Sequence, residues 1–386
     1  MSYILTKMTD IIEFNPRESI AKKQVCKKVP MEYLQPFTRQ ISGYEEAPYA
    51  GGTKFRNNDT IMARITPCLE NGKTAFVKGF AENEVIFGST EYIVMRAIPG
   101  SSDPTFIYYL AISPSFREVA IKSMVGSSGR QRVQQDVLEN LELVLPDYDT
   151  QVRVGKVLAS FDDKIELNAQ INHNLEEQAA LIFADWLQDC TESITIGDLS
   201  TNILDYTPID NGLVRLLNSS DVTEGIFPDT PLVPNANLKG HFKKRFQLGD
   251  ILYSEIRPRN HHYGFVLFDA SEYIASTRLM VIRALDYKVS PAMLYQYLLL
   301  PSVEAEFVLK TESRSGTFPQ GNYADMASIK IPYAPVKTQN MVSSTLTKIR
   351  QTIANNQLEN QQLSELRDSL LPKLMSGEID VSEVEV

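Results

Sequence analysis

Residues 70–74, Glu-Asn-Gly-Lys-Thr, have the types that end a phosphate-binding loop. Such a loop needs a glycine five positions before Gly72, because backbone N–H groups there must approach the phosphates. That position holds Pro67, which has no N–H to donate. The sequence therefore favours a tight turn between strands at this point over a nucleotide site.

A second pattern has the residue types of a metal-dependent nuclease. Asp147, preceded by proline, is followed by Asp162 and Lys164. Nuclease chemistry needs both carboxylates beside one Mg²⁺ ion. Asp162 and Lys164 lie in a helical repeat, and the second copy of that repeat has Arg350 and Thr352 at the matching positions. We therefore interpret these residues as a solvated helix face.

Three histidines and one cysteine are the remaining candidates for a metal site: His241, His261, His262 and Cys190. Their spacing fits no known ligand pattern, and residues 261–263 are expected in a polar loop. No Ser/His/Asp set stands out in the sequence. Neither does a glycine-rich cofactor loop or the Asn-Pro-Pro-aromatic motif of amino-methyltransferases. The chain is interpreted as non-catalytic, with no metal and no cofactor of its own.

Basic residues form small clusters in loops, as DNA-contacting residues do. An arginine that forms two hydrogen bonds to guanine contributes roughly 1–3 kcal/mol of discrimination in the major groove. A solvated surface is the other interpretation of any single cluster. The candidate DNA-binding residues are Arg130, Arg132, Lys243, Lys244, Arg245, Arg257, Arg259 and Arg314.

These clusters fall in two copies of one unit, which repeat along the chain with a nearly constant offset. The matching pairs are Ser89-Thr90 and Ser276-Thr277, Ser128-Gly129 and Ser315-Gly316, and Leu145-Pro146 and Ile331-Pro332. In each copy, short β-rich runs alternate with turn signals, and helical stretches follow near 105–122 and 291–310. The predicted fold class is α+β, with two repeated domains.

A long helix is expected at the end of each copy. From residue 150, apolar residues recur at alternating steps of four and three, a heptad seam typical of paired helices. The seam recurs 188 residues later, with Asn168 and Asn172 matched by Asn356 and Asn360. A buried Asn in a seam lowers stability but fixes helix register. The matched pairs favour two helices packed antiparallel, as a coiled-coil spacer, over two separate surface helices.

Local signals set the expected ends of these helices. Asp149 or Thr150 can cap the first helix and Thr338 the second. Pro372 should end or kink the second helix, and Arg367 is the one poor fit in its seam. A helix of ~36 residues would be about 54 Å long. The predicted segments are a first domain at 1–149, a first spacer helix at 150–192, a second domain at 193–336, and a second spacer helix with a tail at 337–386.

Several blocks, in order along almost the whole chain, resemble the specificity (S) subunits of type I restriction-modification systems. They include Phe55 to Lys73, Phe87 to Tyr92, Gly129 to Val133, Leu158 to Asn168 and Leu366 to Glu378. The second domain departs most from the pattern. It has Ser254-Glu255-Ile256-Arg257-Pro258 where the first domain has Ala63-Arg64-Ile65-Thr66-Pro67. Such divergence is expected where two different half-sites are read.

The resemblance implies two target-recognition domains, related by a pseudo-twofold, that each read one half of a split double-stranded DNA sequence. The paired helices would act as a ruler for the unread gap. The chain would dock two methyltransferase (M) subunits, which carry S-adenosylmethionine. Restriction (R) subunits would add DNA cleavage that uses ATP and Mg²⁺. Alternatives from other classes are a stand-alone DNA methylase or nuclease, and a coiled-coil scaffold that does not bind DNA.

Taken alone, the formal net charge of −10 counts against a DNA partner, because phosphate binding needs clustered basic residues. Residues 1–150 carry 17 basic and 18 acidic side chains, and residues 193–335 carry 13 and 15, so both domains are near neutral. The rest of the charge lies on the spacer helices and tail, which we expect to stay off the phosphates. Three scattered cysteines, no signal peptide and no apolar run of ~18 residues favour a cytoplasmic protein without membrane partners.

Overall fold

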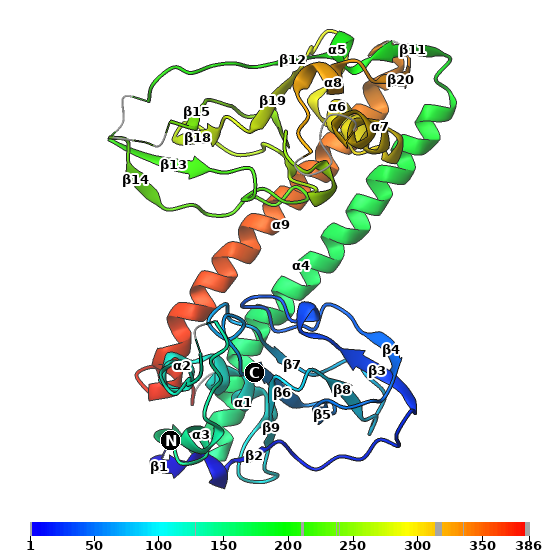
Figure 1. The fold of residues 1–386 in the computed structure, drawn as a ribbon. Helices are drawn as coiled ribbons and strands as arrows, with labels where there is room; N and C mark the ends of the chain where they lie inside the picture. Colours follow the sequence, from blue (N-terminus) through cyan, green and yellow to red (C-terminus); the bar gives the residue numbers. More distant parts are fainter. Residues whose placement is uncertain are drawn as a thin grey trace. The chain divides into compact units, whose positions relative to one another are not determined.

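A computed structural model describes residues 2–127, 129–209, 212–236, 238, 240–312, 319–334 and 336–382. The chain forms two compact units. Unit 1 consists of Met1–Leu167 and Glu359–Val386, and unit 2 consists of Asn168–Leu358. Each unit combines small β-sheets with helices (Figure 1). The predicted α+β class with two repeated domains is confirmed.

Unit 1 contains two four-stranded sheets. The first is antiparallel, in the order β2 (Ile12–Phe14), β9 (Tyr92–Ala97), β6 (Asp59–Ala63), β7 (Thr74–Phe76). The second has the order β4 (Glu45–Pro48), β3 (Val25–Val29), β8 (Ile86–Gly88), β5 (Lys54–Phe55), and β3 and β8 are parallel. A separate pair joins β1 (Tyr3–Lys7) to β10 (Glu142–Pro146). The helices are α1 (Pro104–Ile112), α2 (Pro114–Lys122) and α3 (Gln135–Glu139), with short 3-10 turns at Met8–Asp10 and Met31–Tyr33.

Unit 2 repeats this plan strand by strand. Its antiparallel sheet has the order β12 (Ser200–Asn202), β19 (Leu279–Ala284), β16 (Ile251–Ser254), β17 (Tyr263–Phe265). Its mixed sheet has the order β14 (Leu232–Pro234), β13 (Leu213–Leu217), β18 (Tyr273–Ser276), β15 (Phe242–Lys244). The pair β11 (Glu192–Thr195) and β20 (Lys330–Tyr333) matches β1 and β10. The helices are α5 (Ile196–Leu199), α6 (Pro291–Leu298), α7 (Pro301–Glu312) and α8 (Tyr323–Ala327), with a 3-10 turn at Pro258–Asn260.

A buried ion pair recurs at the same place in both antiparallel sheets. In unit 1, Arg96 of β9 donates two hydrogen bonds of 2.7 Å to Asp59 of β6. In unit 2, Arg283 of β19 donates to Asp250 of β16 at 2.6 and 2.8 Å. Both carboxylates are at most 1% exposed, so each needs a charged partner to offset its desolvation. The sequence repeat therefore extends to the interior of each domain.

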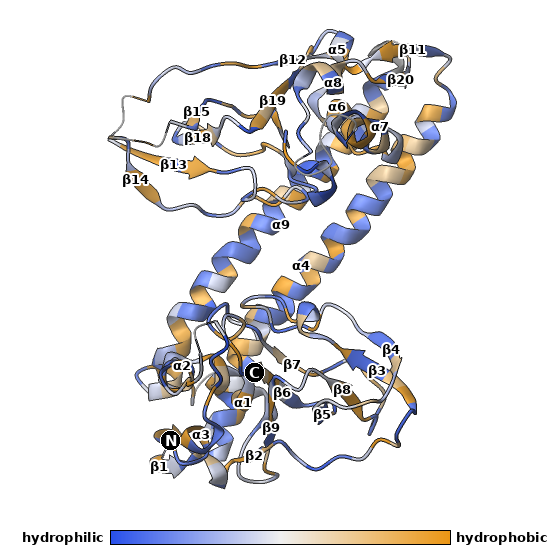
Figure 2. Ribbon diagram, viewed as in Figure 1, coloured by the Kyte–Doolittle hydropathy of each residue, from blue (hydrophilic) through white to orange (hydrophobic). Residues whose placement is uncertain are grey.

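Two helices of 41 residues, α4 (Tyr148–Gln188) and α9 (Val336–Ser376), each contribute to both units. Within unit 1, Asn360 donates to the carbonyl of Ile165 at 3.4 Å. Within unit 2, Asn356 donates to Asn172 at 2.7 Å. In both units, the residue numbers of α9 decrease along the contact as those of α4 increase, so the contacting segments run antiparallel. Figure 2 shows orange apolar residues interspersed with blue polar residues along both helices.

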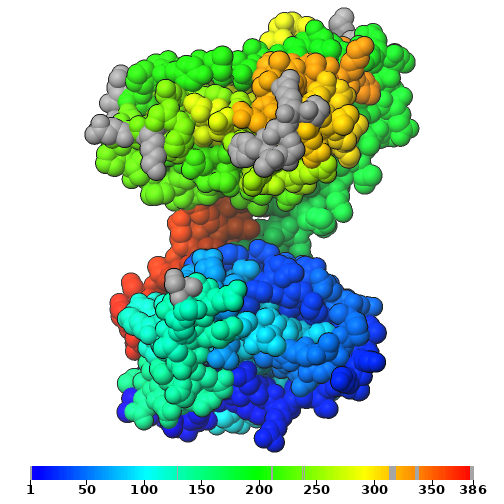
Figure 3. Space-filling model, in the orientation of Figure 1, coloured from blue at the N-terminus to red at the C-terminus, as the bar shows by residue number. Residues whose placement is uncertain are grey.

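The apolar residues of these helices are part of the domain cores. Leu371 and Leu374 of α9 join the unit 1 core, which also contains Val154 of α4. Phe183 and Trp186 of α4 join the unit 2 core, together with residues of α9. Figures 1 and 3 both show the red end of α9 beside the teal segment that contains α2. Each domain is therefore packed against segments of both helices.

The ends of the helices differ in part from the sequence-based expectations. Asp147, rather than Asp149 or Thr150, caps α4 by accepting a 3.0 Å hydrogen bond from the Thr150 N–H. Pro372 lies inside α9 and does not end it, because the helix continues to Ser376. The side chain of Thr338, the other expected cap, lies outside the described residues. Among the described helices, none is both long enough and apolar enough to cross a membrane.

Candidate nucleic-acid interface and paired helices

The candidate arginines of unit 1 lie on a loop that is tied back to the sheet region. The backbone of Arg132 forms bridges with Ile65 and Val125. Its guanidinium donates to both carboxylate oxygens of Glu91 at 2.6–3.0 Å, and these bonds hold the pKa of Glu91 below its usual value. Arg130 is exposed and has no ion-pair partner among the described residues. The loop thus carries one arginine held by a carboxylate and one exposed arginine.

The basic run of unit 2 lies at β15 and does not form one surface. Lys243 is exposed, but Lys244 is 3% exposed and donates to the carbonyl of Leu279 at 2.7 Å. Burial lowers the pKa of Lys244. The assignment of Lys244 to a DNA contact does not fit this position, because alternate residues of a strand point to opposite faces. Arg245 is half-buried and donates to the carbonyl of Ser271 at 2.9 Å.

The remaining unit 2 candidates surround the 3-10 turn at 258–260. Arg257 is exposed and adopts the left-handed backbone region with φ of 46°, a conformation that is strained for a residue with a side chain. Arg259 is 70% exposed and donates to Glu312 at 2.9 Å, which lowers the pKa of Glu312. Arg314 lies outside the described residues. The two described arginines therefore sit on a loop of defined, strained geometry.

His261 lies between two carboxylates and has the polar surroundings expected from the sequence. Its ring nitrogens lie 3.0 Å from Glu224 and 2.8 Å from Glu304. The hydrogen bond with Glu224 is the main reason that the pKa of His261 is raised. His262 instead contacts the carbonyl of Val222 at 2.9 Å. Within the described ranges, no three His, Cys, Asp or Glu side chains are grouped as metal ligands would be.

Asp162 is buried, so its interpretation as part of a solvated helix face is wrong. Arg367 of α9 forms an ion pair with it, and Tyr109 of α1 donates to it at 2.6 Å. Burial raises the pKa of Tyr109, which keeps the hydroxyl protonated as a donor. Lys164 pairs with Glu359 at 3.4 Å and is exposed, as expected of a helix surface. The sequence missed the buried pair because its partners are 205 positions apart.

The four asparagines of the helices occupy the region between α4 and α9. Asn168 is 1% exposed. Asn172 accepts a hydrogen bond from Asn356 and donates to the carbonyl of Ile353 at 3.5 Å. Asn360 donates a hydrogen bond to the carbonyl of Ile165 in α4, within unit 1. Asn172, Asn356 and Asn360 are partly buried, and each forms a hydrogen bond from one helix to the other.

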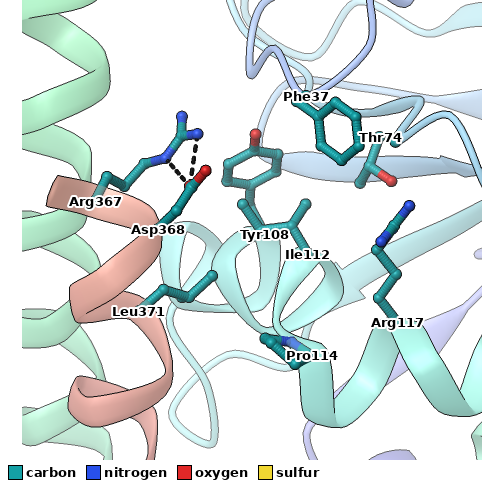
Figure 4. Close-up of a pocket in the computed structure, with 10 residues that line it drawn as sticks. Phe37, Thr74, Tyr108, Ile112, Pro114, Arg117, Arg367, Asp368 and Leu371 are labelled. Atoms are coloured by element: carbon teal, nitrogen blue, oxygen red, sulfur yellow. Dashed lines mark hydrogen bonds and ion pairs between the residues drawn. The ribbon is translucent and has the colours of Figure 1, made fainter. Parts of the chain in front are cut away.

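A pocket of about 160 Å³ lies in unit 1 between α9, α1 and α2 (Figure 4). Its walls are largely apolar, and the guanidinium of Arg117 lies 5.3 Å from the ring centre of Phe37. Arg117 also donates to the carbonyls of Leu69 and Glu70 at 3.2 and 2.8 Å. The pocket is smaller than the ~300–1,000 Å³ usual for small-molecule sites. It is therefore a poor fit for S-adenosylmethionine or ATP.

Comparison with known protein families gives one match that covers most of the chain. The family described as "Type I restriction modification DNA specificity domain" matches residues 5–177 and 234–365. These two ranges include one copy each of the antiparallel sheet ion pair, Asp59–Arg96 and Asp250–Arg283.

Individual proteins support the same relationship. The chain is 33% identical over 190 residues to the type I restriction enzyme HindI specificity subunit of Haemophilus influenzae, a match that covers 48% of this chain but only 40% of that protein. It is 22% identical over 305 residues to the MjaIX specificity subunit of Methanocaldococcus jannaschii, covering 72% and 70%. The type I restriction-modification S subunit from M. genitalium has the same fold, with a TM-score of 0.57, 14% identity and coverage of 97% and 96%.

Proposed function

The chain belongs to the type I restriction modification DNA specificity domain family, and from this membership we propose that it recognises a split double-stranded DNA sequence. The observation that carries the proposal is the repetition of one domain plan on two shared helices. Two domains of the same topology but different loops suit two half-sites of different sequence. Asparagines that bond one helix to the other would restrict the helix register, which suits a spacer of fixed length.

We propose that the bases are read in the major groove, where each base pair presents a distinct set of donors and acceptors. The proposed contacts in unit 1 are Arg130 and Arg132. In unit 2 they are Lys243, Arg245, Arg257, Arg259 and Arg314. Lys244 is left out because its ammonium group is occupied inside the domain. Arg132 and Arg259 suit this role because an existing carboxylate partner holds each guanidinium in one orientation.

The chain is proposed to be non-catalytic and to act through partners. Two M subunits would supply S-adenosylmethionine and the methylation site, and R subunits would supply ATP- and Mg²⁺-dependent cleavage. The acidic helices and the near-neutral domains suit this division, because much of the positive surface around the DNA would then come from the partners. A cytoplasmic location is part of the same proposal.

Methylome sequencing of cells that express this chain with its methyltransferase tests the proposal directly. A bipartite methylated sequence with a constant gap is the expected result. Incubation of the purified chain alone with DNA, Mg²⁺ and S-adenosylmethionine separates the alternatives. Turnover would favour a stand-alone methylase or nuclease. A salt-dependent gel shift without sequence preference, in the presence of the methyltransferase, would favour a scaffold.

The asparagines of the helices give a second test of the ruler. Replacing Asn168 and Asn356 by Leu removes polar groups that restrict register. We expect both half-site sequences to stay unchanged, while assembly with the methyltransferase or the gap length becomes less uniform. Methylome sequencing and the mass of the assembled complex are the measurements. Unchanged assembly together with an unchanged gap would contradict the proposed role.

A further inference from the structure

Two equivalent positions of the paired helices carry opposite buried charges. Asp162 of α4 and Arg350 of α9 are separated by 188 residues, which is the offset between the two helical repeats. Asp162 is 3% exposed and Arg350 is 4% exposed. Their surroundings are also equivalent. Tyr109 donates to Asp162 at 2.6 Å, and Arg350 donates at 2.8 Å to Gln296, which stands 187 residues after Tyr109.

The partners of these two residues have the complementary charges. In unit 1, Asp162 pairs with Arg367 of α9. In unit 2, Arg350 pairs with Glu176 of α4. The polarity of the contact is therefore inverted between the units. As a result α4 supplies both acidic residues and α9 supplies both arginines. Asp162 and Arg350 stand at equivalent positions, whereas Arg367 lies 191 positions after Glu176, so their partners differ from exact equivalence by three residues, about one helical turn.

We propose that these charges restrict each helix of the pair to a partner of the other kind. The first half of the chain is defined as residues 1–190 and the second half as residues 191–386. In a pair of two first halves, Asp162 would occupy the place of Arg350 and meet Glu176 of the other copy. In a pair of two second halves, Arg350 would occupy the place of Asp162 and meet Arg367 of the other copy.

Each same-half pair would place a buried charge, Asp162 or Arg350, against a like charge, and a buried charge that loses its partner is strongly destabilising. A mixed pair forms both attractive contacts. Charge patterns of this kind select partners in coiled coils by penalising the wrong pairing as well as by favouring the right one. The surface that α4 presents thus fits one partner, an α9 helix, whether from the same chain or from a second copy. This inference rests on contacts between helices and is independent of DNA recognition.

The test starts from the intact, folded chain. A protease recognition sequence is placed at residues 189–191, between the end of α4 and β11, and the purified protein is cut there. Two cut preparations that differ in a mass tag are mixed, dissociated in urea and refolded. Native mass spectrometry then counts mixed and same-half pairs. Random association would make about half of all pairs same-half pairs.

For the wild-type sequence we expect mixed pairs to outnumber same-half pairs by at least about tenfold, which corresponds to about 1.4 kcal/mol. Random pairing of the wild-type halves would overturn the proposal without any variant. The paired substitution E176R with R350E keeps an attractive contact in the intact chain. It also makes both same-half pairs attractive, because the new arginine meets Asp162 and the new glutamate meets Arg367. The ratio of same-half to mixed pairs should then rise about tenfold, to the value expected for random association.

Reversal of the unit 1 contact, D162R with R367D, makes the same prediction and serves as a second variant. Reversal of all four residues should restore mixed pairing. The matched control is K164E with E359K, which reverses an ion pair with side chains 43% and 45% exposed. The equivalent positions hold Thr352 and Ile171, so this control creates no new contact and should pair like the wild type.

Thermal unfolding of each uncut variant confirms that it is folded before pairing is measured. The proposal would be overturned if the two charge-reversal variants, E176R with R350E and D162R with R367D, are folded but pair as the wild type does. Selectivity would then come from packing, for example of Phe183 and Trp186. Loss of selectivity in the control, K164E with E359K, as complete as in the charge-reversal variants would also overturn it.

Discussion

Unit 1 and unit 2 share their strand order but hold their candidate DNA-contacting arginines in different ways. The Arg132 backbone is bridged to neighbouring segments, and its side chain is paired with Glu91. Arg257 and His261 instead flank a 3-10 turn in left-handed conformations. A common framework carries two loops of different geometry. The difference teaches that burial fixes the framework, while loops at the surface can diverge in sequence and geometry.

The largest expected effect concerns the framework that the units share. Arg96→Met and Arg283→Met each leave a buried carboxylate unpaired and should lower the free energy of unfolding of their own unit by about 3–5 kcal/mol. Arg96→Met should have the larger effect, because Arg96 also donates to Glu18 at 2.7 Å. Urea unfolding followed by circular dichroism measures both variants.

The single tryptophan, Trp186, lies in the unit 2 core and distinguishes the units. Its fluorescence transition should move for Arg283→Met and stay in place for Arg96→Met. Equal shifts in both variants would mean that the units unfold together. Lys122→Met is the control, because Lys122 is 76% exposed and pairs only with an exposed glutamate among the described residues.

An intermediate effect is expected for the loops. Arg132→Ala and Arg259→Ala should each weaken binding of the assembled complex to its DNA by about 1–3 kcal/mol. Arg132→Ala should relax the sequence of one half-site, and Arg259→Ala should relax the other. Methylome sequencing measures this separation. Relaxation of the same half-site by both variants would contradict the division of labour between the units.

The smallest effect is a pH dependence confined to unit 2. The carboxylates beside His261 raise its pKa, so the protonated ring stabilises the folded state. This stabilisation is complete below the usual histidine pKa of about 6.5 and is lost as the pH rises through the raised value. His261→Gln should remove it, with a change below about 1 kcal/mol because the pair is partly exposed. Tryptophan fluorescence during urea unfolding at pH 6 and pH 9 measures it.

Local patterns predicted much of the framework. The short β-rich runs expected in each copy are present as strands, such as β7 and β9 in unit 1 and β19 in unit 2. The helical stretch near 105–122 is divided into α1 and α2, since Pro114 cannot donate the N–H that would continue α1. These features were predictable because hydrophobic alternation, turn residues and proline act on the chain locally.

The candidate site was less accessible to sequence reasoning, because its chemistry depends on distant partners. Lys244 is buried and donates to a carbonyl 35 residues away, and nothing near it in the sequence distinguishes it from Lys243. The buried charge of Asp162 depends on Arg367. The poor fit of Arg367 in the apolar seam signalled an unusual position in the helix. The sequence did not show that Asp162 of the other helix is its partner.

Unit 1 is built from both ends of the described chain, which determines when its core is completed during translation. Its core contains Leu371, Leu374 and Val381, and Tyr3 of the first strand donates to the carbonyl of Leu374 at 3.3 Å. A ribosome completes every residue of unit 2 before it reaches residue 359. The domain whose residues emerge first is therefore the last to be complete. Until then, its nascent core exposes the apolar surface that α9 later covers. Unit 1 is therefore the unit that depends more on protection from aggregation during translation.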